Sequence, residues 1–308
     1  MHALAIPLLL AVGSLLAVQA AANVQLSAAT GSPFGASTLQ LGIGAFILLV
    51  AVAVAGGFGA FGLLDDAPAW HLAGGLASSL YITSGILLFP RLGALLTVGL
   101  WIAGQMLASL VLDGFGWLGV EQDPPGLAQL AGGVAVVAGT AVIVRTQAGS
   151  EAIGRALRER LGWIVLGLVA GAALPVQGAV NAQLRGDLDA SIAAGAVSFV
   201  VATAGMALLL GVALALGAPR PRLQPLRGLP WWAWLGGLVG AAYVTSVFLS
   251  IPKIGAAPTI ALTVAGQQLA SVLVDRYGLL RLPARPVTGA RLAAVAVLLA
   301  GVMLITLA

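Results

Sequence analysis

Two sets of polar residues with the same types and spacing interrupt an otherwise apolar chain. Each set has a glutamine, a serine and an aspartate at positions i, i+4 and i+8, so each lies on one face of a helix. The sets are Gln105, Ser109 and Asp113, and Gln267, Ser271 and Asp275. Such a stripe can bind a polar solute, with its serine and aspartate as gate or coupling residues. Alternatively, the stripe only ties helices together, and each aspartate marks a turn or a membrane boundary.

The position of each aspartate supports either explanation. Both end an expected helix, where the helix dipole disfavours a negative charge. Gly104 and Ala108, and Gly266 and Ala270, run beside the stripes as small-xxx-small ridges. Such ridges predict close contact with another helix.

Further polar residues occur in pairs inside apolar segments. Glutamine and asparagine lie four residues apart in two segments, and Tyr-x-Thr-Ser occurs in two others. Buried amides cost free energy unless they find partners, so we expect them to face the protein interior or a wet cavity. The candidate substrate-binding residues are Gln19, Asn23, Tyr81, Gln105, Gln177, Asn181, Tyr243 and Gln267. Hydrogen bonds that only hold helices together would also account for them.

The polar residues recur because the chain contains one sequence twice. Residues 81–116 match residues 243–278 at 17 of 36 positions, at a constant offset of 162, and Val18–Leu26 returns as Val176–Leu184. We expect a first repeat at 1–147, a short amphipathic cytoplasmic linker at 148–161 and a second repeat at 162–308. With five helices in each repeat, the second must be inverted relative to the first, as in many alternating-access transporters.

Composition identifies the chain as a membrane protein. Hydrophobic residues make up 60% of it, charged residues make up 8%, and the mean hydropathy is +1.07. Apolar stretches of about 20 residues have the length that a helix needs to cross a bilayer. We therefore predict an all-α polytopic fold with ten transmembrane helices in two inverted five-helix repeats. The predicted spans are 3–22, 36–57, 69–89, 93–112, 126–146, 162–182, 190–216, 231–251, 254–275 and 287–307.

Basic residues predict the orientation in the plasma (inner) membrane. Twelve of the 14 fall in loops on one side of the membrane, and only Arg185 and Lys253 fall on the other. Because basic loops stay in the cytoplasm, both termini are expected outside it. The twelve are Arg91, Arg145, Arg155, Arg158, Arg160, Arg220, Arg222, Arg227, Arg276, Arg281, Arg285 and Arg291.

Few residues could support enzyme chemistry. The sequence has no cysteine, and His2 and His71 do not form a ligand cluster. No carboxylate, histidine or lysine falls near the middle of a predicted span, and no phosphate-binding loop is present. We predict that the protein is not an enzyme and binds no metal or cofactor. Its expected partners are a small-molecule substrate and membrane lipid but no nucleic acid, with a homodimer left open.

Each half resembles the YdcZ-like family of small inner-membrane proteins, which is placed in the drug/metabolite transporter superfamily. The resemblance rests on Val-Gln-x-x-x-Asn-x-Gln-Leu in the first helix and Ala-Gly-Gln-x-Leu-Ala-Ser-x-x-x-Asp in the fourth. It covers almost the whole chain as a fused tandem copy. It implies two inverted five-helix bundles around a central cavity and transport by alternating access. Related ten-helix proteins export or exchange small metabolites.

The leading functional prediction is a secondary transporter, more specifically an exporter, of a small amphipathic or polar metabolite. It requires Gln19, Gln177, Tyr81 and Tyr243 to face a common cavity near the bilayer midplane, and positions on lipid-facing surfaces would contradict it. The alternative is a non-transporting membrane scaffold or assembly partner, whose polar stripes would be packed shut. Substrate, coupling ion, direction of transport and oligomeric state do not follow from these residues.

Overall fold

The computed structural model describes residues 2–148, 153–254 and 256–307, with the side chains at 2–5, 147–148, 153–159, 248–249, 251–254, 256–258 and 307 left aside. Ten α-helices form within these ranges: α1 (His2–Thr30), α2 (Pro33–Val54), α3 (Gly75–Leu92), α4 (Ala94–Phe115), α5 (Leu127–Ala148), α6 (Ile153–Leu188), α7 (Ser191–Ala215), α8 (Leu235–Ile254), α9 (Ala256–Tyr277) and α10 (Gly289–Leu307). Short 3-10 helices lie between them: η1 (Gly57–Leu63), η2 (Ala69–Gly74), η3 (Trp117–Gly119), η4 (Gln224–Gly228), η5 (Trp231–Trp234) and η6 (Leu279–Arg281).

The prediction of an all-α polytopic membrane protein is confirmed. Each predicted span contains most of one α-helix, and the described residues form no strand. Eight helical segments are long and apolar enough to cross a membrane, and the other two helices, α8 and α9, adjoin residue 255, outside the described residues. Helices α3 and α8 begin later than predicted because 3-10 turns come first. Pro68 and Pro230 directly precede these turns, and neither can donate a backbone hydrogen bond.

Part of the predicted linker at 148–161 is helical. Helix α6 begins at Ile153 and continues to Leu188 without interruption, so much of the linker is the first part of a long helix. Pro175 lies inside this helix and does not end it. Glu151 lies outside the described residues. The exact limits of the two repeats and the linker therefore stay a prediction.

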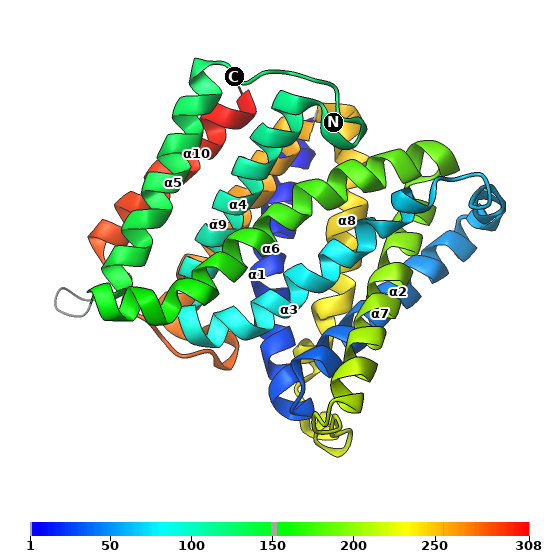
Figure 1. Cartoon of the computed structure of the whole chain (residues 1–308), viewed down its shortest axis with the longest axis horizontal. Coiled ribbons are helices and arrows are strands. Elements are labelled where there is room, and N and C mark those ends of the chain that lie inside the picture. The colour runs from blue at the N-terminus through cyan, green and yellow to red at the C-terminus, as the bar shows by residue number, and fades with distance from the viewer. Residues whose placement is uncertain (1, 149–152, 255, 308) are drawn as a thin grey trace.

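The two halves are interlocked, and their contacts are paired by symmetry. Helix α1 packs against α8 and α9, and its counterpart α6 packs in the same way against α3 and α4. Helices α2 and α7 form one pair across the repeats, and α5 and α10 form another. Figure 1 shows α5 and α10 on one side of the bundle, α2 and α7 on the opposite side, and both termini at the same end.

Glycines allow the closest of these contacts, as the small-xxx-small ridges predict. A Cβ atom on Gly104 of α4 would lie 2.1 Å from the backbone oxygen of Leu168 on α6. A Cβ atom on Gly266 of α9 would lie 2.1 Å from the backbone oxygen of Leu10 on α1. Because real Cβ atoms do not approach a backbone oxygen so closely, even alanine would force the helices apart.

This packing gives a first test. We expect Gly104→Ala to lower the free energy of unfolding by about 1–3 kcal/mol, since overpacking displaces backbone. Gly211→Ala on α7 is the matched control: no other atom lies within 4 Å of its added Cβ. Alanine in a helix is favoured over glycine by about 1 kcal/mol. Denaturant unfolding in detergent measures both, and equal shifts for the two variants would contradict the packing described.

Candidate functional site

A buried hydrogen bond joins the two repeats in the middle of the bundle. The side-chain amide of Gln267 on α9 donates to the hydroxyl of Tyr81 on α3, at 2.7 Å. The ring of Tyr81 packs on Trp101 with 4.2 Å between centroids, and the indole N–H of Trp101 donates to Ser84 Oγ at 3.1 Å. Two of the predicted binding residues are thus in direct contact, and Trp101 and Ser84 fix the tyrosine in place.

The symmetry-related residues, Gln105 of α4 and Tyr243 of α8, are in a different state. Gln105 is buried, and among the described residues its Nε2 has no hydrogen-bond partner. Tyr243 is half-buried, and among the described residues no hydrogen bond joins it to Gln105. Of the two symmetry-related tyrosine–glutamine pairs between the repeats, Tyr81 and Gln267 are therefore hydrogen bonded, whereas Tyr243 and Gln105 are not.

One difference between the repeats accompanies this separation. Thr263 stands at the position that Trp101 occupies in the first repeat, at the common offset of 162. Trp101 presents a flat apolar surface to Tyr81, whereas the small Thr263 side chain donates its hydroxyl to the backbone oxygen of Ile260 at 2.9 Å. The mismatch was visible in the sequence comparison, but its consequence needs the contacts.

The predicted asparagines lie in helix–helix contacts. Asn181 Nδ2 donates to Ser198 Oγ at 3.1 Å, and Asn181 Oδ1 would lie 2.3 Å from a Cβ on Gly74, just before α3. Asn23 has the equivalent position, 2.4 Å from a Cβ on Gly236 at the start of α8. These contacts position α1 and α6 against their neighbours.

The predicted glutamines of α1 and α6 are also buried. Gln19 Nε2 would lie 2.9 Å from a Cβ on Gly240 of α8. Gln177 Oε1 has no hydrogen-bond partner within the described part of the chain. A buried amide oxygen without a partner is costly, so it needs water or a solute to accept from. Both glutamines are buried rather than exposed on a lipid-facing surface, and the common cavity stays a prediction.

Asp275 binds the first turn of another helix. Its two carboxylate oxygens accept hydrogen bonds from the backbone amides of Ala94, at 2.7 Å, and Leu95, at 3.0 Å, where α4 begins. An anion at a helix N-terminus is stabilised both by the free amides and by the helix dipole. This explains a carboxylate at the unfavourable end of its own helix: the N-terminus of α4 outweighs the C-terminus of α9.

Arg285 also binds the loop between α3 and α4. Its Nη2 donates to the carbonyl oxygens of Pro90, at 3.0 Å, and Arg91, at 3.2 Å, at the end of α3. Gly93, which separates α3 from α4, has φ +83°, and a Cβ on it would lie 2.5 Å from Arg285 Cδ. We call Asp275, Arg285 and residues 90–95 the Asp275 clasp. It ties the α3–α4 loop of the first repeat to the α9–α10 loop of the second.

The corresponding loop of the first repeat has the same backbone but different charges. The N–H of Asp123 donates to the carbonyl of Asp113 at 2.8 Å, as the N–H of Arg285 does to that of Asp275 at 2.7 Å. An acid thus stands where the clasp has an arginine. The Asp113 side chain is half-buried, interacts with the like charge of Asp123 and makes no hydrogen bond within the described residues.

The remaining gate candidates follow the same asymmetry. Ser271 on α9 is fully buried, whereas Ser109 on α4 is half-buried. Helix α1 packs against α3, but no comparable contact joins their counterparts α6 and α8 in the described residues. The side chains of the α9 stripe are therefore more deeply buried than those of the α4 stripe.

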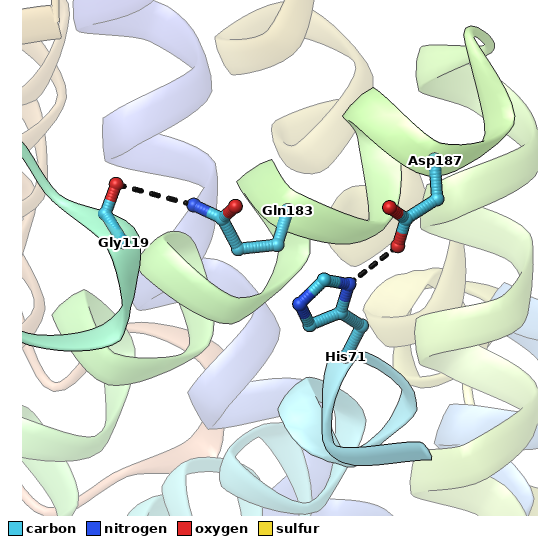
Figure 2. Close-up of polar contacts among 4 residues, drawn as sticks. All are labelled: His71, Gly119, Gln183 and Asp187. Carbon is cyan, nitrogen blue, oxygen red and sulfur yellow. Dashed lines mark hydrogen bonds and ion pairs between the residues drawn. The ribbon is translucent and has the colours of Figure 1, made fainter. Parts of the chain in front are cut away.

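A polar cluster that the sequence did not reveal lies at the end of α3 opposite the clasp. His71 of η2 pairs through Nδ1 with the carboxylate of Asp187 on α6, and Gln183 Nε2 donates to the carbonyl of Gly119 at 3.3 Å (Figure 2). Trp70 packs edge-on against the ring of His71, with 4.0 Å between centroids. These contacts tie the end of α6 to two loops of the first repeat.

We expect His71→Ala to lower the free energy of unfolding by about 1–2 kcal/mol, because the partly exposed Asp187 loses its hydrogen-bond partner. Gln183→Ala, which loses a long and exposed bond to a neutral carbonyl, should cost less than about 0.5 kcal/mol. Thermal unfolding of the two variants in one detergent gives the comparison. An effect of His71→Ala no larger than that of Gln183→Ala would show that the pair contributes little.

A sequence comparison now identifies the family. The model of the family described as "Putative inner membrane exporter, YdcZ" matches residues 4–142 and 162–304. The chain belongs to the YdcZ family. Each match covers one run of five helices, so the chain contains the YdcZ unit twice. The description of the family names an inner-membrane exporter of the drug/metabolite transporter type, which is a transporter rather than an enzyme, and this chain is a multi-pass member of that family.

The fold has a counterpart among solved structures. A crystal structure described only as that of a protein aligns over 96% of this chain and 96% of its own, with a TM-score of 0.57 and 18% identity. At that identity the likeness shows a shared fold for the YdcZ pair and nothing about its substrate. No curated protein matches.

Proposed function

We propose that this tandem YdcZ chain is a secondary transporter that exports a small polar or amphipathic metabolite by alternating access. One observation carries the proposal: the two symmetry-related tyrosine–glutamine pairs are in different states. Tyr81 and Gln267 are bonded, whereas Gln105 stands without a partner. Because the repeats are inverted, each end of a central path is built from the same parts, and the repeats can exchange their states.

The solute would bind between the stripes of α4 and α9. Gln105 and Gln177 each contribute a buried amide atom that lacks a partner within the described residues. Tyr81 and Tyr243 add two hydroxyls and two aromatic rings. The predicted spans have no carboxylate, histidine or lysine near their middle, so a neutral or zwitterionic solute fits better than one with a net charge.

The two aspartates would act as alternating gates. In the present state Asp275 caps α4 and closes one end. In the exchanged state Asp275 would leave α4, and the symmetric contacts of Asp113 would form at the opposite end. In the orientation that the arginines predict, the clasp would lie on the cytoplasmic side with both termini outside, and the present state would be closed toward the cytoplasm.

Reconstituted vesicles test the proposal. Vesicles with and without the protein are loaded with a mixture of small metabolites, and the loss of each solute is followed by mass spectrometry. We expect at least one neutral or zwitterionic solute to leave faster through the protein. Repeating the assay with a pH gradient shows whether protons drive the flux. Equal losses from both kinds of vesicle for every solute would favour the scaffold alternative.

A further inference from the structure

A groove between α9 and α10 is lined entirely by aliphatic side chains. Its volume is about 370 Å³, and its lining includes Leu269, Val272 and Leu273 of α9 and Leu292 and Val295 of α10. Leu269, Leu273 and Leu292 are about half exposed, so the groove is open to the membrane side of the bundle. A surface of this kind can hold a hydrocarbon chain.

One end of the groove runs into the Asp275 clasp. Val272 precedes Asp275 by three residues on α9, and Val295 follows Arg291 by four on α10. Residues three or four apart share a helix face, so the lining continues directly into Asp275 and Arg291. The groove therefore leads along α9 and α10 to the buried charged cluster.

The cluster has more positive charge than its single acid can balance. Asp275 interacts with both Arg285 and Arg291, which leaves one positive charge in excess. Arg291 is only 5% exposed, and its Nε has no hydrogen-bond partner within the described residues. Arg285 Nε is also buried and, within the same residues, unpartnered. Guanidinium groups with free donors bind phosphate strongly.

From this surface we infer a binding site for one acidic phospholipid. Its phosphate accepts hydrogen bonds from Arg285 and Arg291, and an acyl chain lies in the α9–α10 groove. Exposed Arg276 and Arg281 beside the cluster add attraction for a negatively charged headgroup. A free phosphate ion could use the arginines but not the groove.

The first repeat provides an internal comparison. The positions that correspond to Arg285 and Arg291 are Asp123 and Gln129. The aliphatic faces recur there without the positive charge, so the site is expected at only one of the two symmetric places. A bound lipid would brace α10 against α9 beside the Asp275 clasp and so favour the closed state; this consequence alone rests on the proposed function.

The test is a titration of phosphatidylglycerol into protein held in phosphatidylcholine, with the midpoint of thermal unfolding as the readout. With the wild-type chain, we expect the midpoint of thermal unfolding to rise and to saturate as phosphatidylglycerol is added. The double variant R285D/R291Q introduces the residues that stand at these positions in the first repeat. It should lower the affinity for phosphatidylglycerol at least about tenfold. Ala296→Leu fills the groove and leaves the arginines in place, and it should lower the affinity for phosphatidylglycerol to a similar degree. Ala141→Leu, at an exposed alanine on α5, should not.

Each outcome decides the inference. Inorganic phosphate in phosphatidylcholine should not reproduce the rise; if it does, the site binds a simple anion and the lipid is excluded. An absent or non-saturable response in the wild type also overturns the proposal. If the double variant fails to fold, Ala296→Leu still tests the groove, and full affinity in that variant contradicts a bound acyl chain. None of these measurements requires flux, so they stand or fall separately from transport.

Discussion

Replacing Asp275 with alanine is expected to destabilise the protein by about 3 kcal/mol and to release the first turn of α4. The substitution removes both hydrogen bonds to the amides of Ala94 and Leu95. It also leaves Arg285 and Arg291 without their nearest anion. Thermal unfolding reports the first effect. Hydrogen exchange reports the second, as faster exchange of the Ala94 and Leu95 amides.

Asp113→Ala is the matched control, because Asp113 occupies the symmetric position. Its side chain is half-buried beside the like charge of Asp123, so we expect a loss of less than about 1 kcal/mol. Asp275→Asn should fall between the two alanine variants, since it keeps one oxygen acceptor. Similar losses for Asp275→Ala and Asp113→Ala would mean that the two ends are in the same state, against the asymmetry described.

Alanine substitutions of Gln267 and Gln105 are expected to have similar effects on transport but different effects on stability. Gln267→Ala removes the donor to the Tyr81 hydroxyl, and we expect flux to fall at least about tenfold and the free energy of unfolding to fall by about 1 kcal/mol. Gln105→Ala should lower flux to the same degree, because the exchanged state needs Gln105 in the same role. Its stability should hardly change, because its Nε2 has no partner among the described residues.

Vesicle flux and denaturant unfolding on the same preparations measure both quantities. Tyr81→Phe, which removes only the hydroxyl, tests whether the hydrogen bond rather than the ring matters. Two results would contradict the proposed exchange of roles. One is unchanged flux in both alanine variants, and the other is a stability loss in Gln105→Ala as large as that in Gln267→Ala.

Much of this architecture follows from the sequence because hydrophobic length and internal repetition are strong signals. Ten apolar stretches predict ten helices, and the offset of 162 predicts which residues are equivalent. The glycine ridges at Gly104 and Gly266 predicted close contacts, and the structure supplies their partners on α6 and α1. These features depend on the neighbours of each residue along its own helix.

The contacts across the repeats could not be read in the same way. Asp275 caps a helix that begins 181 residues earlier in the chain, which requires knowing which loops the inverted copy brings together. His71 and Asp187 have no paired counterpart, because Ala233 and Ala29 stand at the equivalent positions. A search of the repeats for shared polar residues therefore passes over them. The aligned repeats differ at Trp101 and Thr263, but how this difference breaks the symmetry depends on the contacts in the folded protein.

The central claim, that the two ends open in alternation, can be tested with thiols because the chain has no cysteine of its own. Ser109→Cys and Ser271→Cys place one thiol at each of two symmetric positions, half-buried in α4 and fully buried in α9. Labelling rates with a water-soluble maleimide are measured with and without Asp275→Ala. We predict that the thiol at 109 reacts faster in the parent chain, and that Asp275→Ala slows it and speeds the thiol at 271. Rates that change together, or not at all, would contradict alternating access.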